Sequence, residues 1–270
     1  MRIVRYRTAA EPARVGVLVD GGVAPTEYTD MVAFLAAGDA AFAAAERAVD
    51  SGEVIADHVL LAPLPNAGKM LFLGRSFRQY RTDLVDADPV FVYARVASSV
   101  IGPGEPIRMP GPDERILYEG ELLIVIGRAG RGIDQSDAMD HVFGYTQVND
   151  ITWTDWIHGS HGGLPQLTMS KNADTFCPMG PHIVTRDSYD PVSAEFTVTV
   201  NGEVRTRGSM SDLVWTIPHI LEFLSKDMTL HAGDVIATGT SDAQPITAGD
   251  TVVVEFDGLG QLANPVVPGW

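Results

Sequence analysis

The chain has 270 residues, of which 45% are hydrophobic, and its 19 Lys and Arg residues against 35 Asp and Glu residues give a formal charge of −16 at pH 7. This composition is ordinary for a packed globular protein, whereas so acidic a surface disfavours nucleic acid and anionic membranes as partners. No apolar run approaches the roughly 20 residues of a membrane helix, the first residues lack the apolar core of a signal peptide, and the single cysteine, Cys177, excludes an internal disulfide framework. We therefore expect a cytoplasmic protein.

The first part of the chain has the pattern of a small α/β unit. Short strands are expected at residues 3–7 and 15–19. An alanine-rich helix is expected over residues 31–49. Two prolines and a glycine in residues 61–68 interrupt any regular element, which is typical of a linker. We therefore predict a small N-terminal domain, residues 1–66, ahead of a larger domain, residues 67–270.

Beyond the linker the sequence predicts mostly strands. Short apolar or β-branched runs bounded by turn residues lie at residues 70–73, 122–126, 142–148, 235–238 and 252–256. Asn201 and Gly202 separate two further strand patterns and predict a hairpin with a type I′ turn. One helix is predicted over residues 217–225, with Pro218 in its first turn. The fold class that follows is α+β and β-rich.

Two glutamates precede the apolar run at residues 122–126. In one strand Glu119 and Glu121 would point to the same side, because alternate residues of a strand share a face. Two carboxylates so close, on a strand that is otherwise apolar, repel each other and lose hydration, so a proton or a cation should neutralise them. Carboxylate oxygens suit Mg²⁺, Mn²⁺ or Ca²⁺. The alternative is that the strand projects from the core and that water solvates both glutamates.

A third carboxylate follows another apolar strand pattern. Asp150 comes directly after residues 143–149. A carboxylate at the end of a strand is well placed to bind a metal ion, although in that position it often caps the element that follows. With Glu119 and Glu121 it makes a candidate set of three oxygen ligands.

Seven short motifs follow one another beyond residue 70. They are SSVIGP at 98–103, EGE at 119–121, GYTQVND at 144–150, KNADTFCP at 171–178, VNGEV at 200–204, GDVIATGT at 233–240 and GLGQLANP at 258–265. In this order and spacing the chain resembles the fumarylacetoacetate hydrolase superfamily. The resemblance implies a mixed β-roll core, usually in a homodimer. It also implies small-molecule carbonyl substrates, either 2-oxo acids or 1,3-dicarbonyls.

The resemblance also implies roles for individual residues. The positions of Glu119, Glu121 and Asp150 match the family's ligands for Mg²⁺, with Mn²⁺ or Ca²⁺ as alternatives, and the cation stabilises an enolate. Lys171 matches the family lysine that orients water or carries a proton. Thr240, with Gly239, matches a turn that contacts the substrate.

Several positions depart from the family pattern. Hydrolytic members carry a histidine and a glutamate that activate water, and Tyr80 and Asp83 stand at those positions here. A phenol is a poor base at neutral pH but can donate a proton. Arg95 replaces a lysine, and Thr154 replaces a substrate-binding arginine.

The same comparison changes the expected substrate pocket. We expect Arg75, in the segment that leads to Tyr80, to bind substrate, and Trp153 to make the pocket more apolar together with Trp156 and Phe77. His158 or His161 could take the place of the missing histidine.

Together with these residues, the resemblance implies a divalent-metal-dependent enzyme that acts on a 2-oxo acid or 1,3-dicarbonyl through an enolate. C–C bond hydrolysis, decarboxylation and isomerisation or tautomerisation all remain open, although the loss of the His–Glu pair disfavours simple hydrolysis. The alternative is a metabolite-binding protein with the same fold and no catalysis.

Overall fold

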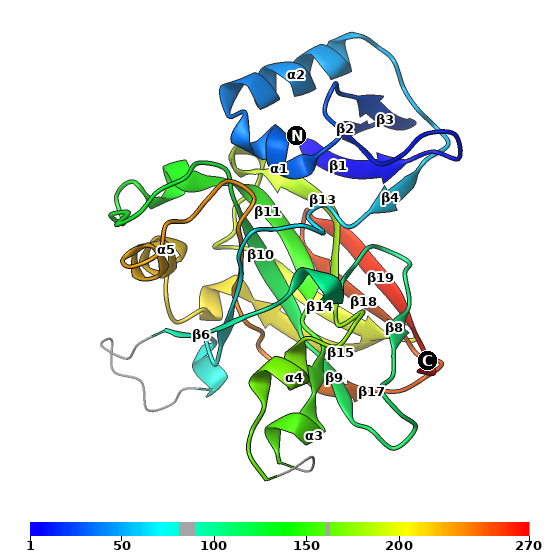
Figure 1. Ribbon diagram of the computed structural model, residues 1–270, viewed down its shortest axis with the longest axis vertical. Coiled ribbons are helices and arrows are strands. Elements are labelled where there is room, and N and C mark those ends of the chain that lie inside the picture. The colour runs from blue at the N-terminus through cyan, green and yellow to red at the C-terminus, as the bar shows by residue number, and fades with distance from the viewer. Residues whose placement is uncertain (81–89, 160–162, 270) are drawn as a thin grey trace.

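The computed structural model describes residues 1–80, 90–159 and 163–269. It is β-rich with mixed sheets, which confirms the predicted fold class (Figure 1). One end of the molecule contains β1 (Arg2–Arg7), β2 (Arg14–Val19), β3 (Gly22–Pro25), α1 (Met31–Ala36), α2 (Asp39–Asp50) and β4 (Val59–Leu61). No helix in the described ranges is both long enough and apolar enough to cross a membrane.

A large sheet runs through the centre of the molecule. Its further strands are β5 (Met70–Gly74), β6 (Phe91–Ala94), β7 (Val100–Ile101), β10 (Gly120–Ile126), β11 (Val142–Asn149), β13 (Cys177–Thr185) and β16 (Val235–Ala237). The order across the sheet is β3-β2-β1-β13-β11-β10-β16-β5-β6, with β4 paired to β1 and β7 paired to β13. Among the described strands, β6 is therefore an edge strand.

Two smaller sheets complete the described part of the fold. A five-stranded sheet contains β8 (Ile107–Arg108), β14 (Glu195–Val200), β15 (Glu203–Ser209), β18 (Thr251–Phe256) and β19 (Gly260–Val267). A three-stranded sheet contains β9 (Ile116–Tyr118), β12 (Thr152–Trp153) and β17 (Gln244–Ile246). The remaining α-helices are α3 (Thr154–Ile157), α4 (Leu167–Lys171) and α5 (Ile217–Ser225). Helices α3 and α4 lie at the end opposite to α1 and α2.

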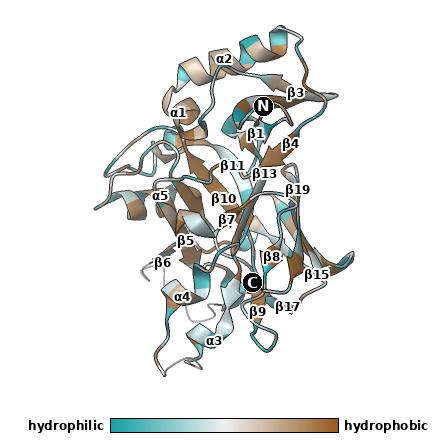
Figure 2. Ribbon diagram, turned by 45° about the vertical axis from the view of Figure 1, so that its right-hand side comes forward, coloured by the Kyte–Doolittle hydropathy of each residue, from teal (hydrophilic) through white to brown (hydrophobic). Residues whose placement is uncertain are grey.

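Strand β10 separates two hydrophobic cores, and Figure 2 shows it coloured as apolar. Leu122, Ile124 and Ile126 face a core that also contains residues of α5 and of the five-stranded sheet. Leu123 and Val125 face a second core, which α1 and α2 cover. Burial on both faces explains why this strand is a continuous apolar run instead of an alternating one.

The N-terminal segment joins the large sheet directly. Strand β1 pairs antiparallel with β13, and residues of α1, α2, β10 and β13 share one core. The division into domains at residues 1–66 and 67–270 concerns independent folding and remains a proposal.

Two predicted elements are each broken in two. The helix predicted over residues 31–49 is α1 and α2, because Gly38 between them has φ +57°, outside the helical region. The strand expected to carry both Glu119 and Glu121 is also interrupted, because β9 ends at Tyr118 and belongs to a different sheet from β10. Glu119 therefore lies at the junction of two sheets.

The predicted hairpin and the later helix are confirmed. Asn201 and Gly202 connect β14 to β15 with φ +55° and +80°, the two positive values of a type I′ turn. Helix α5 spans residues 217–225, with Pro218 in its first turn and Thr216 accepting a hydrogen bond from the His219 N–H.

Gly144 of β11 lies directly against the backbone of β13. A Cβ at this position would lie 2.1 Å from the carbonyl oxygen of Val184 and 3.0 Å from Cα of Thr185, and neither backbone atom can rotate away. We predict that Gly144→Ala lowers the free energy of unfolding by about 1–3 kcal/mol or more, as overpacking does. Urea unfolding measures this change. Gly111→Ala is the control, because its Cβ would meet only the flexible Glu114 side chain; equal losses in the two variants would contradict the prediction.

Candidate functional site

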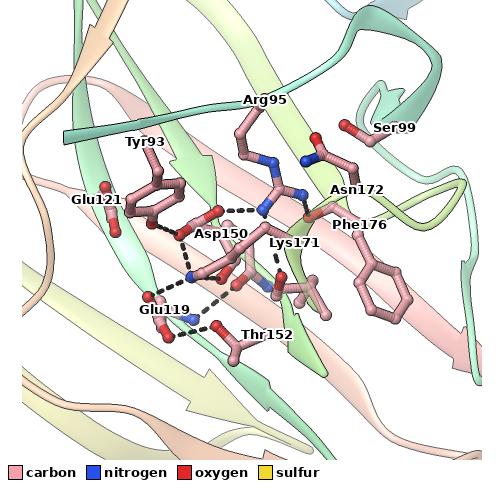
Figure 3. A network of polar contacts seen from close by, with 12 residues as sticks. Tyr93, Arg95, Ser99, Glu119, Glu121, Asp150, Thr152, Lys171, Asn172 and Phe176 are labelled. Carbon is pink, nitrogen blue, oxygen red and sulfur yellow. Dashed lines mark hydrogen bonds and ion pairs between the residues drawn. The ribbon is translucent and has the colours of Figure 1, made fainter. Parts of the chain in front are cut away.

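Three carboxylates meet where β10 begins and β11 ends. Gly120 pairs with Asn149 in the antiparallel register, and the Asp150 N–H donates to the Glu119 carbonyl at 2.8 Å. This register brings Glu119, Glu121 and Asp150 together, so that one oxygen of each lies within 4.8 Å of the others. Figure 3 shows the three carboxylates together with the positively charged side chains of Arg95 and Lys171.

Glu121 is the carboxylate with fewest partners. Its side chain is buried, and Oε2 accepts a hydrogen bond from the Gly239 N–H at 2.9 Å. Oε1 is also buried and accepts no hydrogen bond from any group in the described part of the chain. Burial, and then the negative charges of Asp150 and Glu119, raise the pKa of Glu121 well above its ordinary value.

Glu119 is better compensated. Its Oε1 accepts a hydrogen bond from the Thr152 hydroxyl, and Oε2 lies 2.9 Å from Nζ of Lys171. Burial raises the pKa of Glu119, and the positive charge of Lys171 opposes that rise without cancelling it.

Asp150 is the most strongly held of the three. Its side chain is fully buried and accepts hydrogen bonds from Arg95 on Oδ1 and from Tyr93 and Lys171 on Oδ2. Burial acts to raise the pKa of Asp150, but Lys171 and Arg95 outweigh it, so that the pKa is lowered. Asp150 therefore remains ionised.

Lys171 connects two of the carboxylates. It is the last residue of α4, and its Nζ bonds to both Asp150 and Glu119 while lying 5.2 Å from the centre of the Tyr93 ring. Burial favours the neutral amine, but Asp150 and Glu119 outweigh it and raise the pKa of Lys171. The lysine is therefore protonated at neutral pH.

The cluster fits a divalent cation. Three carboxylates converge, and one of their oxygens, Oε1 of Glu121, is buried without a donor from the described residues. Hard oxygen ligands of this kind suit Mg²⁺, Mn²⁺ or Ca²⁺.

Comparison with known proteins identifies the family. Residues 73–267 match the model of the fumarylacetoacetate (FAA) hydrolase C-terminal domain. The chain belongs to the fumarylacetoacetate hydrolase family. It is 34% identical to a Xenopus laevis protein named as a mitochondrial oxaloacetate tautomerase, over 99% of this chain and 90% of that one. An oxaloacetate tautomerase of Bacillus subtilis is 36% identical over 77% of this chain and 72% of its own.

A solved structure of the same family extends the comparison to a ligand complex. The maleylpyruvate hydrolase of Sphingobium sp. SYK-6, described in complex with manganese(II) ion and pyruvate, superimposes with a TM-score of 0.85 at 27% identity. The match covers 100% of both chains. Relatives of this chain therefore include tautomerases and hydrolases, and one of them binds a divalent metal.

The other residues singled out in the sequence lie in several places. Gly239 borders Glu121, whereas the Thr240 hydroxyl donates to the Asp242 carbonyl at 3.0 Å. Arg75 is exposed, directly after β5, with φ +55°. The indole N–H of Trp153 donates to Glu114 at 2.7 Å.

Three of the predicted catalytic groups cannot be placed. The backbone of Tyr80 ends a short 3₁₀ turn, but its side chain lies outside the described residues, as do Asp83 and His161. His158 is exposed after α3. The expectation that Phe77 lines the pocket was wrong, because Phe77 is fully buried in the core and contacts Phe196.

Tyr93 is a site residue that no sequence motif indicated, and Arg95 was expected only as the replacement of a family lysine. Both donate to Asp150 from the end of β6. Their spacing of two residues was the available signal, because alternate residues in a strand share a face. The sequence does not reveal that β6 lies across from Asp150. Tyr93 precedes Asp150 by 57 residues along the chain, and Arg95 precedes it by 55.

The raised pKa of Glu121 predicts a pH-dependent cost in the metal-free protein. Above the ordinary pKa of a glutamate, the folded state keeps a proton on Glu121 that the unfolded chain releases. The contribution of Glu121 to the free energy of unfolding is therefore present at low pH and is lost as pH rises through the raised pKa. Glu121→Gln removes the ionisation and keeps the shape. In EDTA at about pH 8, we expect the free energy of unfolding of the variant, measured by urea unfolding, to exceed that of the wild type by about 1–3 kcal/mol. At about pH 4 the two proteins should differ little.

The same variant tests metal binding. Added Mn²⁺ should stabilise the wild type and leave Glu121→Gln unchanged, since a ligand oxygen has lost its charge. Glu203→Gln, at an exposed site, serves as the control and should behave as the wild type in both conditions. If the metal-free wild type were more stable than Glu121→Gln at about pH 8, the raised pKa of Glu121 would be contradicted.

Proposed function

We propose that this protein is a divalent-metal-dependent enzyme that interconverts the keto and enol forms of a 2-oxo acid. The observation that carries the proposal is the buried cluster of three carboxylates with a protonated lysine bonded to two of them. The tautomerases among the relatives, two of which are described above, support this choice among the reactions known in the family.

Glu119, Glu121 and Asp150 would hold the metal, with Mg²⁺ proposed and Mn²⁺ or Ca²⁺ as alternatives. Bound there, the cation would draw electron density from the 2-oxo group and make a proton on the neighbouring carbon, C3, easier to remove. Oε1 of Glu121, to which no described residue donates a hydrogen bond, supports this set of ligands.

The charges of the site support an anionic substrate. Three carboxylates face two cations, Arg95 and Lys171, which leaves one net negative charge when all are ionised. A divalent cation would change this to one net positive charge. Because an uncompensated charge is costly in a buried site, a substrate that brings a carboxylate suits the site better than a neutral dicarbonyl.

Lys171 is the group best placed to carry the proton. Keto–enol conversion moves one proton between C3 and the carbonyl oxygen and requires no other reactant. A protonated Lys171 can give its proton to C3 of the enol, while the enol hydroxyl releases one to regenerate the ammonium group. Tyr93, whose pKa burial and the nearby carboxylates raise well above its ordinary value, stays a phenol and continues to donate to Asp150.

The sequence supports tautomerisation over hydrolysis. Tyr80 and Asp83 stand where hydrolytic relatives have the pair that activates water. Tautomerisation consumes no water, so it does not require that pair. Both remain proposed catalytic residues. Isomerisation, decarboxylation and C–C bond cleavage would use the same enolate chemistry.

Further assignments belong to the same proposal. The substrate-binding residues would be Thr240, Gly239, Arg75 and Trp153. A homodimer and a cytoplasmic location also remain predictions.

Replacement of Lys171 tests the reaction. With Mg²⁺ present, ketonisation of enol-oxaloacetate can be followed by ultraviolet absorbance. We expect Lys171→Met to lower kcat by about 100-fold or more, the usual effect of losing a general acid. Lys226→Met, on the surface after α5, is the control and should be as active as the wild type.

Binding measurements separate the enzyme from the non-catalytic alternative. An enzyme and a non-catalytic binding protein should both bind Mg²⁺ in calorimetry. If Lys171→Met kept full activity, the proposed role of the lysine would be wrong. If the wild type bound metal and oxalate but turned over no 2-oxo acid, the protein would be a metabolite-binding member of the family.

A further inference from the structure

Tyr93 is an uncharged donor to the most strongly held carboxylate of the site. Its hydroxyl donates to Oδ2 of Asp150, while Arg95, two residues further along the chain, donates to Oδ1. Figure 3 shows both side chains pointing at Asp150 from the same segment. Rotation of the carboxylate group about the bond that carries it would break these hydrogen bonds, because their geometry is directional. Tyr93 and Arg95 together therefore fix the plane of the Asp150 carboxylate.

The ring of Tyr93 makes a second contact within the site. Nζ of Lys171 lies 5.2 Å from the centre of the ring, within the range of a cation–π interaction. The same Nζ bonds to Asp150 and to Glu119. Tyr93 thus contacts a proposed metal ligand through its hydroxyl and the proposed proton carrier through its ring.

The large sheet holds the ring of Tyr93 in this place. Phe72 and Tyr93 lie opposite each other in the antiparallel pairing of β5 with β6, and their ring centres are 6.0 Å apart. Phe72 is fully buried in the core that α1 and α2 cover, so its ring cannot move aside without disturbing that core. The position of Tyr93 is therefore set by the sheet as well as by its hydrogen bond to Asp150.

We propose that Tyr93 is a positioning residue with two separable roles. Its hydroxyl orients Asp150 as a metal ligand, and its ring holds the ammonium group of Lys171 where the proton is transferred. The inference rests on the proposed function, because it assigns the metal to the carboxylates and the proton to Lys171.

A neutral donor suits this position better than a third cation would. Arg95 and Lys171 already supply two positive charges to the three carboxylates, and a divalent cation would leave one net positive charge. Another cationic side chain would add to that excess in a buried site, at a further cost. A phenol donates a hydrogen bond and leaves the charge unchanged.

Tyr93→Phe tests the role of the hydroxyl, because it removes the hydrogen bond to Asp150 and keeps the ring. In calorimetry, the metal-free full chain is titrated with Mn²⁺. We expect Tyr93→Phe to bind Mn²⁺ roughly 10- to 100-fold more weakly than the wild type, the usual effect of losing a hydrogen bond to a metal ligand.

Tyr93→Leu tests the role of the ring, because it removes the hydroxyl and the ring together. Its affinity for Mn²⁺ should agree with that of Tyr93→Phe within about threefold, since both variants lose the same hydrogen bond. In ketonisation of enol-oxaloacetate at saturating Mn²⁺, its kcat should be roughly 3- to 30-fold lower than that of Tyr93→Phe, because only the leucine variant loses the contact with Lys171.

The same two substitutions at Tyr145 are the matched controls. Tyr145 is fully buried on β11, and its hydroxyl has no hydrogen-bond partner among the described residues. Tyr145→Phe and Tyr145→Leu should each keep the Mn²⁺ affinity and kcat of the wild type within about twofold, even where urea unfolding shows that the leucine variant is less stable. If they reproduced the losses seen at Tyr93, those losses would be general effects of packing and the inference would be overturned.

The remaining outcomes distinguish this inference from the function on which it rests. If Tyr93→Phe binds Mn²⁺ as tightly as the active wild type, or more tightly, the role of the hydroxyl is overturned and the proposed function stands. If Tyr93→Leu and Tyr93→Phe have equal kcat, the role of the ring is overturned. If the wild type neither binds Mn²⁺ nor converts enol-oxaloacetate, the proposed function and this inference are both overturned.

Discussion

The balance of buried charge around Asp150 is the constraint on which the site depends. Three carboxylates in a space of a few ångströms would repel one another strongly in a medium of low polarity. Arg95 and Lys171 offset this repulsion, and each comes from a segment distant in sequence from the carboxylates. The ion pairs therefore link β10 and β11 to the end of β6 and to α4. A change in any of these segments alters the electrostatics of all of them.

The large sheet fixes where the buried carboxylates meet their partners. Strand β10 is buried on both faces, so a shift of one residue in its register with β11 and β16 would exchange the side chains of the two cores and turn Glu121 away from Asp150. Glu121 is placed on the same face as Leu123 by that register. The hydrophobic cores position the polar site in this way, although they contribute no chemistry to it.

The sequence was sufficient to predict the β-rich fold class and to propose the three carboxylates and Lys171, because their signals are local: apolar runs, turn residues and motifs in order. It was not sufficient where geometry depends on distant segments. Glu119 was expected within one strand, but the chain changes sheets there. Tyr93 donates to Asp150 across a separation of 57 residues, which no spacing rule reveals. The break at Gly38 was locally visible, yet an alanine-rich pattern on both sides of it favoured one continuous helix.

Strand β6 pairs with only one neighbour among the described strands, and it carries Phe91 and Tyr93, with Arg95 immediately after it. An edge strand exchanges residues more freely than a central one, because fewer neighbours must adapt. Position 91 can therefore vary without moving the donors to Asp150, whereas Tyr93 and Arg95 are constrained by the buried carboxylate that they bind. This edge of the sheet thus combines an exchangeable exposed position with two positions that the buried aspartate constrains.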